Sequence, residues 1–221
     1  MFMMSFKLLL ISAALAGLSG AVWAGNLQVS VLDKEGKPVQ DAVVILQPAA
    51  SGAPKTPLPA QASISQEKMR FVPAVTLVAA GAKVRFVNND PWEHHVRTSA
   101  VGIAQFNASS NEGSSLMIEG KAEGRPARSV DAVFDKPGAV MLGCHLHASM
   151  RGNIYVSDSP WAALTDADGF VQFDAVPDGA AQIKVWQADQ LIDIAPQTIK
   201  LGAAPVKATM QLNVVPRKKR V

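Results

Sequence analysis

One stretch of the sequence concentrates side chains that can bind a transition metal. Residues 143–152 contain Cys144, then His147 three positions later, then Met150 three positions after that. A tight loop with this spacing can bring a thiolate, an imidazole and a thioether around one point. The apolar segment 153–156 follows at once and is expected to be a strand that anchors the loop.

A second stretch, residues 87–96, follows an alternating apolar segment and contains two adjacent histidines. The four histidines of the sequence, His94, His95, His145 and His147, all lie in these two stretches. Two imidazoles and a thiolate in a plane, with a weak axial thioether, suit both oxidation states of copper. Such ligands are best held by two loops at one end of a β-sandwich. The pattern therefore predicts one copper ion, Cu(I)/Cu(II), that transfers single electrons.

Cys144 is the only cysteine, so an intramolecular disulfide is excluded. In an exported protein a single thiol tends to be oxidised unless it is buried or bound to a metal. The alternative reading is that Cys144 is a small buried apolar side chain. The neighbouring histidines favour the metal.

The composition is that of a globular protein, with 48% hydrophobic and 18% charged residues in a chain of 221. The formal net charge of +3 is small and scattered, which argues against nucleic-acid binding. The one basic run, residues 217–220, belongs to a predicted tail at 216–221. We expect a solvated tail; docking on an acidic partner or on anionic lipid is the alternative.

The first 24 residues have the pattern of a secretory signal peptide. Lys7 precedes an apolar run over residues 8–20, and residues 22–24 place small or apolar side chains at the cleavage site. This predicts a periplasmic or secreted protein whose mature chain begins near Gly25, with an uncleaved N-terminal anchor as the alternative. No later segment is apolar and long enough to predict a membrane span.

The rest of the chain is predicted to be all-β. Short alternating segments are separated by Gly, Pro and Asp turns, which is typical of a β-sandwich. The expected strands are 27–32, 42–46, 74–78, 83–87, 103–106, 116–118, 132–134, 139–142, 153–156, 169–173, 181–186 and 206–214.

The two ends of the chain resemble parts of one module. The segments VSVLDKEGKPVQDAVVIL (residues 29–46) and TDADGFVQFDAVPDGAAQIKVW (residues 165–186) resemble the carboxypeptidase regulatory-like, or prealbumin-like, sandwich. The resemblance implies a discontinuous sandwich, 25–50 with 158–215, into which a second sandwich at 60–157 is inserted. The alternative is two sandwiches in series, with 25–60 in the first.

The inserted segment resembles the cupredoxins. FVPAVTLVAAGAKVRFVNNDPWEHHV (residues 71–96) resembles their first ligand region, and FDKPGAVMLGCHLHASMRGNIYV (residues 134–156) resembles their second. The Cys-x2-His-x2-Met spacing is similar to that of the amicyanin and pseudoazurin types, whereas the plastocyanin and azurin types have longer loops. The resemblance covers residues 69–156 and implies a Greek-key β-sandwich.

The resemblance also implies the role of each ligand. His94 matches the His of the family's His-x-Val and is the first imidazole ligand. Cys144 is the thiolate, His147 the second imidazole, and Met150 the axial ligand. In the family, the histidine matching His147 is near the surface and is the electron port.

An apolar docking patch is expected around that port. Trp92, Leu146 and Ala148 would lie near it, although ordinary packing at the end of the sandwich is the alternative for Trp92.

The sequence departs from the family at three positions. His95 stands where the family often has an Asn that ties the two ligand loops together, Leu142 replaces an aromatic residue, and His145 directly follows the Cys. His95 and His145 are expected to point away or to be hydrogen-bond donors around the site. The alternative is that one of them replaces or supplements a ligand.

The implied function is that of a type 1 copper protein carrying electrons between redox proteins such as a c-type cytochrome or a periplasmic dehydrogenase. A copper chaperone, store or sensor is one alternative, and an adhesion or ligand-binding module is another. No motif in the sequence predicts an enzyme. The whole architecture also resembles bacterial proteins labelled "methylamine utilization protein".

Overall fold

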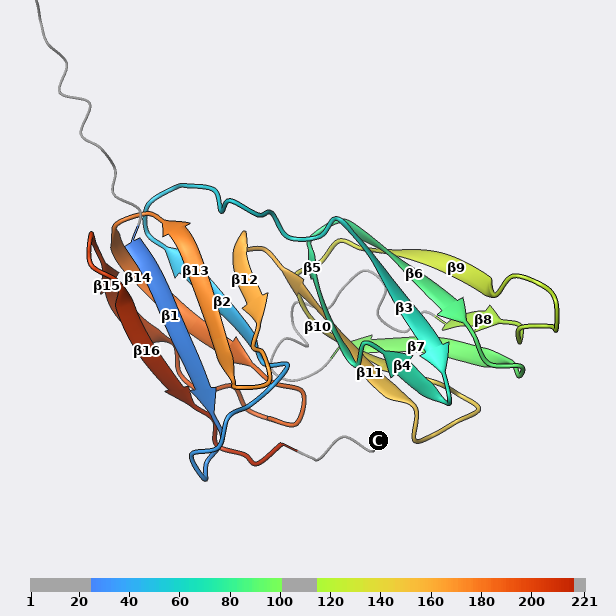
Figure 1. Ribbon diagram of the computed structural model, residues 1–221. Coiled ribbons are helices and arrows are strands. Elements are labelled where there is room, and N and C mark those ends of the chain that lie inside the picture. Colours follow the sequence, from blue (N-terminus) through green and yellow to red (C-terminus); the bar gives the residue numbers. More distant parts are fainter. Residues whose placement is uncertain (1–24, 101–114, 217–221) are drawn as a thin grey trace, which may run out of the picture.

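The computed structural model describes residues 25–100 and 115–216, and this part of the chain contains sixteen β-strands and no helix. The prediction of an all-β fold is confirmed. The strands form two sandwiches that lie side by side (Figure 1). The predicted signal peptide, the predicted strand at 103–106 and residues 217–221 of the tail lie outside the described residues. Among the described residues, no helix is long and apolar enough to span a membrane.

The first sandwich contains both ends of the described chain. One sheet has the order β13 (Phe170–Val176), β1 (Gly25–Leu32) and β16 (Val206–Gln211). The other has the order β12 (Trp161–Leu164), β2 (Val43–Pro48), β14 (Gly179–Trp186) and β15 (Gln197–Leu201). Side chains from both sheets, including Leu27, Leu46 and Ile183, form its buried core.

The second sandwich is built from the middle of the chain. Its five-stranded sheet has the order β5 (Val75–Ala79), β11 (Arg151–Ser157), β10 (Gly138–Gly143), β7 (His94–Ala100) and β8 (Ser115–Ile118). The facing sheet has the order β4 (Arg70–Val72), β3 (Gln61–Glu67), β6 (Ala82–Asn88) and β9 (Arg128–Phe134). Phe86 and Phe134 meet in its core with ring centroids 6.4 Å apart.

Strand β6 shows how the sequence pattern builds this sandwich. Ala82, Val84 and Phe86 are buried and alternate with polar or partly exposed residues, as expected for a strand with one face on a core. The same alternation turns Asn88, the last residue of β6, inward at the end of the sandwich. A polar side chain is thereby placed at the base of the first ligand loop.

Five strands have no counterpart among the expected segments: β3, β4, β7, β12 and β15. β3 has the sequence QASISQE, in which only Ile64 and Gln66 are buried. Its inner face carries Ala62, Ile64 and Gln66, so the apolar alternation is weak. Pairing with β6 and β4 determines this strand instead.

Among the strands that the structure describes, the first two pair only with strands near the far end of the chain. Val29 of β1 is opposite Val171 of β13 and Ala208 of β16. Ile45 of β2 is opposite Ala162 of β12 and Lys184 of β14. The residues between β2 and β12 form the second sandwich, so the chain leaves the first sandwich and later returns to it (Figure 1).

An apolar cluster joins the two sandwiches. Ile45 and Trp186 of the first sandwich pack with Val75 and Ala139 of the second, and Tyr155 borders the cluster. The Tyr155 and Trp186 ring centroids are 5.5 Å apart. Burial, with smaller contributions from the negative charges of Asp193 and Asp158, raises the pKa of Tyr155 to about 12.

Tyr155 is the only tyrosine, so it reports on this junction without interference from other phenols. We expect its pKa in the native protein to be about 12, against an ordinary value of 10.0 after unfolding in guanidinium. Because burial favours the neutral phenol, this contribution to the free energy of unfolding is complete below pH 10 and is lost as the pH rises toward 12. Absorbance of the phenolate at alkaline pH measures both values. Trp186→Ala should move the native midpoint back toward 10, whereas Trp186→Phe should move it less; equal midpoints in all three proteins would contradict the packing described.

Candidate metal centre

Three adjacent strands position the predicted ligands. His94 is the first residue of β7, and Cys144 directly follows β10. β10 pairs with β7 on one side and with β11 on the other, and Gly143 is opposite both Arg97 and Arg151. The loop 144–150 therefore closes the β10–β11 hairpin beside the start of β7.

Three of the four predicted donors come together at this end. The Cys144 Sγ lies 3.4 Å from the His147 Nδ1 and 3.7 Å from the His94 Nδ1. One donor atom from each residue lies within 4.8 Å of the other two, close enough for a single metal ion. The two imidazoles meet edge to face, with ring centroids 4.9 Å apart.

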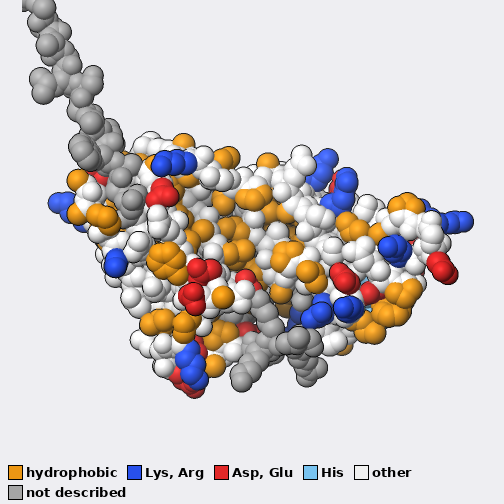
Figure 2. All heavy atoms as spheres, viewed as in Figure 1, with side chains coloured by type: hydrophobic (Ala, Val, Ile, Leu, Met, Phe, Trp, Pro, Cys, Tyr) orange, Lys and Arg blue, Asp and Glu red, His pale blue; other side chains and the backbone are white. Residues whose placement is uncertain are grey.

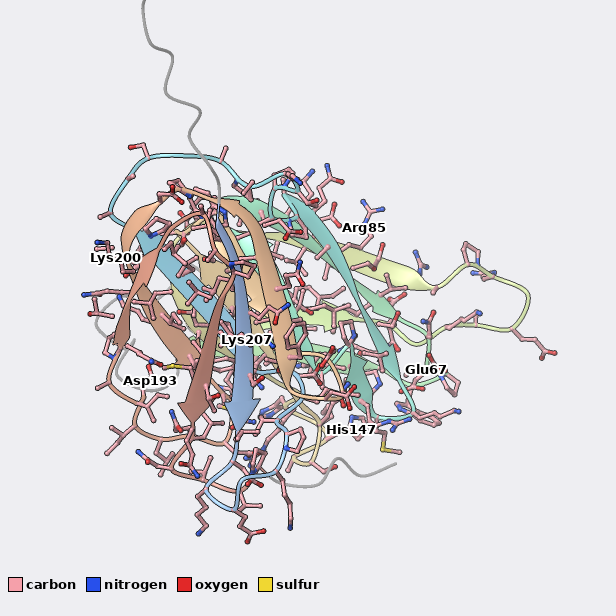
Figure 3. All side chains as sticks on the ribbon, turned by 60° about the vertical axis from the view of Figure 1, so that its left-hand side comes forward. Glu67, Arg85, His147, Asp193, Lys200 and Lys207 are labelled. Carbon is pink, nitrogen blue, oxygen red and sulfur yellow. The ribbon has the colours of Figure 1, made fainter. Side chains whose placement is uncertain are left out.

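Burial differs among the donors. His94 is fully buried and Cys144 is 7% exposed, whereas His147 is only half-buried. Figure 3 shows His147 at the end of the second sandwich where Glu67 also lies. The fourth predicted residue, Met150, is buried in the same apolar cluster as Cys144, and its backbone N–H donates to the His147 carbonyl at 2.9 Å. The site is thus closed on its inner side and approaches solvent at His147.

Asp90 is a further residue of the site, which the sequence analysis did not identify. Its Oδ2 lies 2.8 Å from the His94 Nε2, on the opposite side of the ring from Cys144. Its carboxylate also accepts hydrogen bonds from the backbone N–H groups of Lys68 and Met69, at 2.7 and 2.9 Å. Burial raises the pKa of Asp90, but the hydrogen bonds from Met69, His94 and Lys68 together outweigh burial and hold the pKa below its ordinary value.

The two additional histidines lie outside the three-donor cluster. The His95 backbone N–H donates to the Cys144 Sγ at 3.4 Å, while its side chain lies 2.8 Å from the Glu93 carboxylate. The ring of His145 stacks against that of His95, with centroids 6.1 Å apart, and its Nδ1 lies 3.4 Å from the Arg97 guanidinium. The chain thus links the two ligand loops through the backbone at position 95.

Asn88 holds the first ligand loop in place. Its fully buried side-chain amide donates to the carbonyls of Trp92, Ile118 and Glu119 at 2.8, 3.1 and 3.1 Å. Its Oδ1 accepts from the Asp90 N–H at 3.0 Å. These contacts tie the loop before His94 to the end of β8.

Several apolar side chains on the ligand loops and on β8 are exposed. Trp92 and Leu146 are 41% and 50% exposed, and Ala148 is exposed as well. Met117 of β8, opposite His95 in the ladder, is 58% exposed. Figure 2 shows hydrophobic side chains at the end of this sandwich, bordered by charged groups.

The segment that contains the metal-binding residues matches a known protein family. Residues 59–157, less than half of the chain, match the family described as "Copper binding proteins, plastocyanin/azurin family". This segment is therefore a cupredoxin-type domain. Its two imidazoles and thiolate are the donor set that copper favours, and copper is its cofactor, as the sequence predicted.

The chain is also similar to solved structures, but the sequence identities and TM-scores are low. The crystal structure of amicyanin from Paracoccus versutus (Thiobacillus versutus) shares 20% identity with a TM-score of 0.35, covering 53% of this chain and 100% of that one. The reduced state of an amicyanin mutant shares 17% identity with a TM-score of 0.34, covering 51% and 99%. No curated protein sequence matches the chain. The assignment accordingly depends on the family match and on the donor atoms.

The hydrogen bonds of Asn88 predict its contribution to stability. Asn88→Ala removes the donor to the carbonyls of Trp92, Ile118 and Glu119, so we expect the free energy of unfolding of the metal-free protein to fall by about 3 kcal/mol. Denaturation in urea measures this loss. Asn89→Ala is the matched control, because Asn89 is exposed and contributes its backbone N–H, which the substitution keeps, to the Gln66 carbonyl. Similar losses in the two variants would contradict the role given to the Asn88 side chain.

Proposed function

We propose that this protein is a periplasmic type 1 copper protein that carries single electrons between redox partners and is not an enzyme. The observation that carries the proposal is the close approach of the Cys144 Sγ to the His94 and His147 Nδ1 atoms. In the proposed site these three residues hold copper and Met150 is the weak axial ligand.

Copper so bound supplies reversible one-electron chemistry between its cuprous and cupric forms. The protein contributes the fixed positions of the donors. His94 and Cys144 are anchored by paired strands and buried in the core, which excludes water and limits their movement when the charge of the site changes.

Electrons would enter and leave through His147. It is the one proposed imidazole ligand that is not fully buried, and the exposed Trp92, Leu146 and Ala148 lie on the loops around it. An apolar surface with a single ligand edge at its centre suits brief docking of a redox protein. A c-type cytochrome or a periplasmic dehydrogenase is the proposed class of partner.

The proposal extends to the rest of the chain. The pairing of β1 and β2 with β12, β13, β14 and β16 supports a discontinuous sandwich over 25–50 and 158–215, with the copper domain at 60–157 inserted. A signal peptide over residues 1–24 would deliver the protein to the periplasm. The resemblance to proteins labelled "methylamine utilization protein" stays a prediction from the sequence.

A copper chaperone, store or sensor is the second candidate function. It is favoured by the stacked His95 and His145 beside the site, of which His145 is exposed. Surface imidazoles near a copper site can receive or release the ion. This candidate predicts that cuprous ion exchanges readily, whereas an electron carrier retains it through many turnovers.

Visible absorption of the purified protein with added cupric ion tests the proposed site. We expect an intense thiolate-to-copper band in the red region that disappears in Cys144→Ser, because only the thiolate supplies that transition. His145→Ala is the matched control: it removes the neighbouring side chain, which lies outside the donor cluster, and should keep the band. A faint band in the wild type, or loss of the band in both variants, would contradict the proposed ligand set.

The docking surface gives a separate prediction. Leu146→Lys places a charge on the apolar surface, so we expect the second-order rate of reduction by a c-type cytochrome to fall about tenfold or more, with the reduction potential unchanged. Stopped-flow kinetics and voltammetry measure the two quantities. Leu191→Lys is the control, since Leu191 is 86% exposed on the other sandwich. Equal rates in the two variants would place the docking surface elsewhere.

A further inference from the structure

The carboxylate of Asp90 is unusually well fixed for a side chain in a loop. Asp90 is 5% exposed. Besides the contact with His94, its Oδ1 accepts from Lys68 N–H and its Oδ2 from Met69 N–H. Its backbone is also held, because its N–H donates to Asn88 and its carbonyl accepts from Lys121 N–H at 2.7 Å.

The two backbone donors lie in the β3–β4 turn, which has an uncommon backbone conformation. Lys68 and Met69 connect β3 to β4, and both have positive φ values, 52° and 56°. Two successive residues in the left-handed region are uncommon outside glycine and asparagine, and here they point both N–H groups at one carboxylate. Figure 3 shows Glu67, the last residue of β3, at the same end of the sandwich as His147.

The contact with His94 determines which ring nitrogen carries the proton. The Nδ1 faces the Cys144 Sγ at 3.7 Å, and the Nε2 faces the Asp90 carboxylate at 2.8 Å. A carboxylate accepts a hydrogen bond, so a neutral His94 that donates to it from the Nε2 keeps the lone pair of its Nδ1 for a metal. This is the tautomer that a copper ion bound at the Nδ1 requires.

We propose that Asp90 is a positioning residue that holds His94 in the copper-binding tautomer and, through its negative charge, favours Cu(II) over Cu(I). This inference rests on the proposed copper site. The carboxylate is buried, so its field at the site is weakly screened by solvent. A negative charge stabilises the doubly charged ion more than the singly charged ion, and the reduction potential of the protein is therefore lowered.

The test is the reduction potential of Asp90→Asn, measured by voltammetry on the copper-loaded full chain. We expect the affinity for Cu(II) relative to Cu(I) to fall about tenfold, which raises the potential by about 59 mV for one electron. Asp90→Glu, which keeps the charge, should lie closer to the wild type. Asp131→Asn is the charge-matched control, because Asp131 is an exposed partner of Arg85 on β9, and its potential should stay near that of the wild type. Equal potentials in Asp90→Asn and Asp131→Asn would overturn the inference.

A measurement on the wild type covers the case in which Asp90→Asn does not fold. In the diamagnetic Cu(I) protein labelled with ¹⁵N-histidine, we expect NMR to show a protonated, slowly exchanging Nε2 on His94. An unprotonated or rapidly exchanging Nε2 would overturn the inference. The absorption band of the wild type tests the copper site itself: its absence would reject the proposed function, whereas its presence with an unshifted potential in Asp90→Asn would reject only the role of Asp90.

Discussion

Burying an imidazole at the end of an apolar sandwich costs free energy unless both ring nitrogens have partners. His94 is fully buried, and its two nitrogens face Cys144 on one side and Asp90 on the other. Each partner in turn depends on a different part of the fold. Cys144 is fixed by the β10–β11 hairpin, and Asp90 by the β3–β4 turn on the facing sheet. The two sheets must therefore pack correctly before this histidine can be buried at low cost.

The same constraint explains why polar contacts gather at this end of the sandwich. Asn88, the last residue of β6, and Asp90, in the loop after it, are buried where backbone carbonyls and N–H groups would otherwise lack partners. Together they provide partners for carbonyls at the end of β8, for the N–H groups of the β3–β4 turn and for the Nε2 of His94. The donor cluster is thus bordered by a hydrogen-bond network in which Asn88 and Asp90 connect the ligand loop to both sheets.

The sequence was sufficient to predict those ligands of the site that lie close together in the chain. The spacing of Cys144, His147 and Met150 lies within one hairpin loop, so it could be interpreted without knowledge of the fold. Asp90 could not be identified in this way, because its importance comes from N–H groups at positions 68 and 69 and from a turn whose residues are not glycine. β3 was missed for a related reason: its inner face carries only a small Ala62, Ile64 and a buried glutamine, which gives a weak apolar alternation. Position 95 was flagged as a departure from the family, but only the structure shows that its backbone makes the link to Cys144.

The arrangement of the two sandwiches leaves the copper end accessible. Ala139, near the start of β10, belongs to the cluster that joins the sandwiches, and Cys144 follows the end of the same strand. Five residues of extended chain separate them by roughly 17 Å, at 3.3–3.4 Å per residue. The first sandwich therefore contacts the second at the end of β10 opposite the ligand loops (Figure 1). Such an attachment can be added to a copper domain without covering His147, because β10 and its neighbours separate the junction from the surface where a partner would dock.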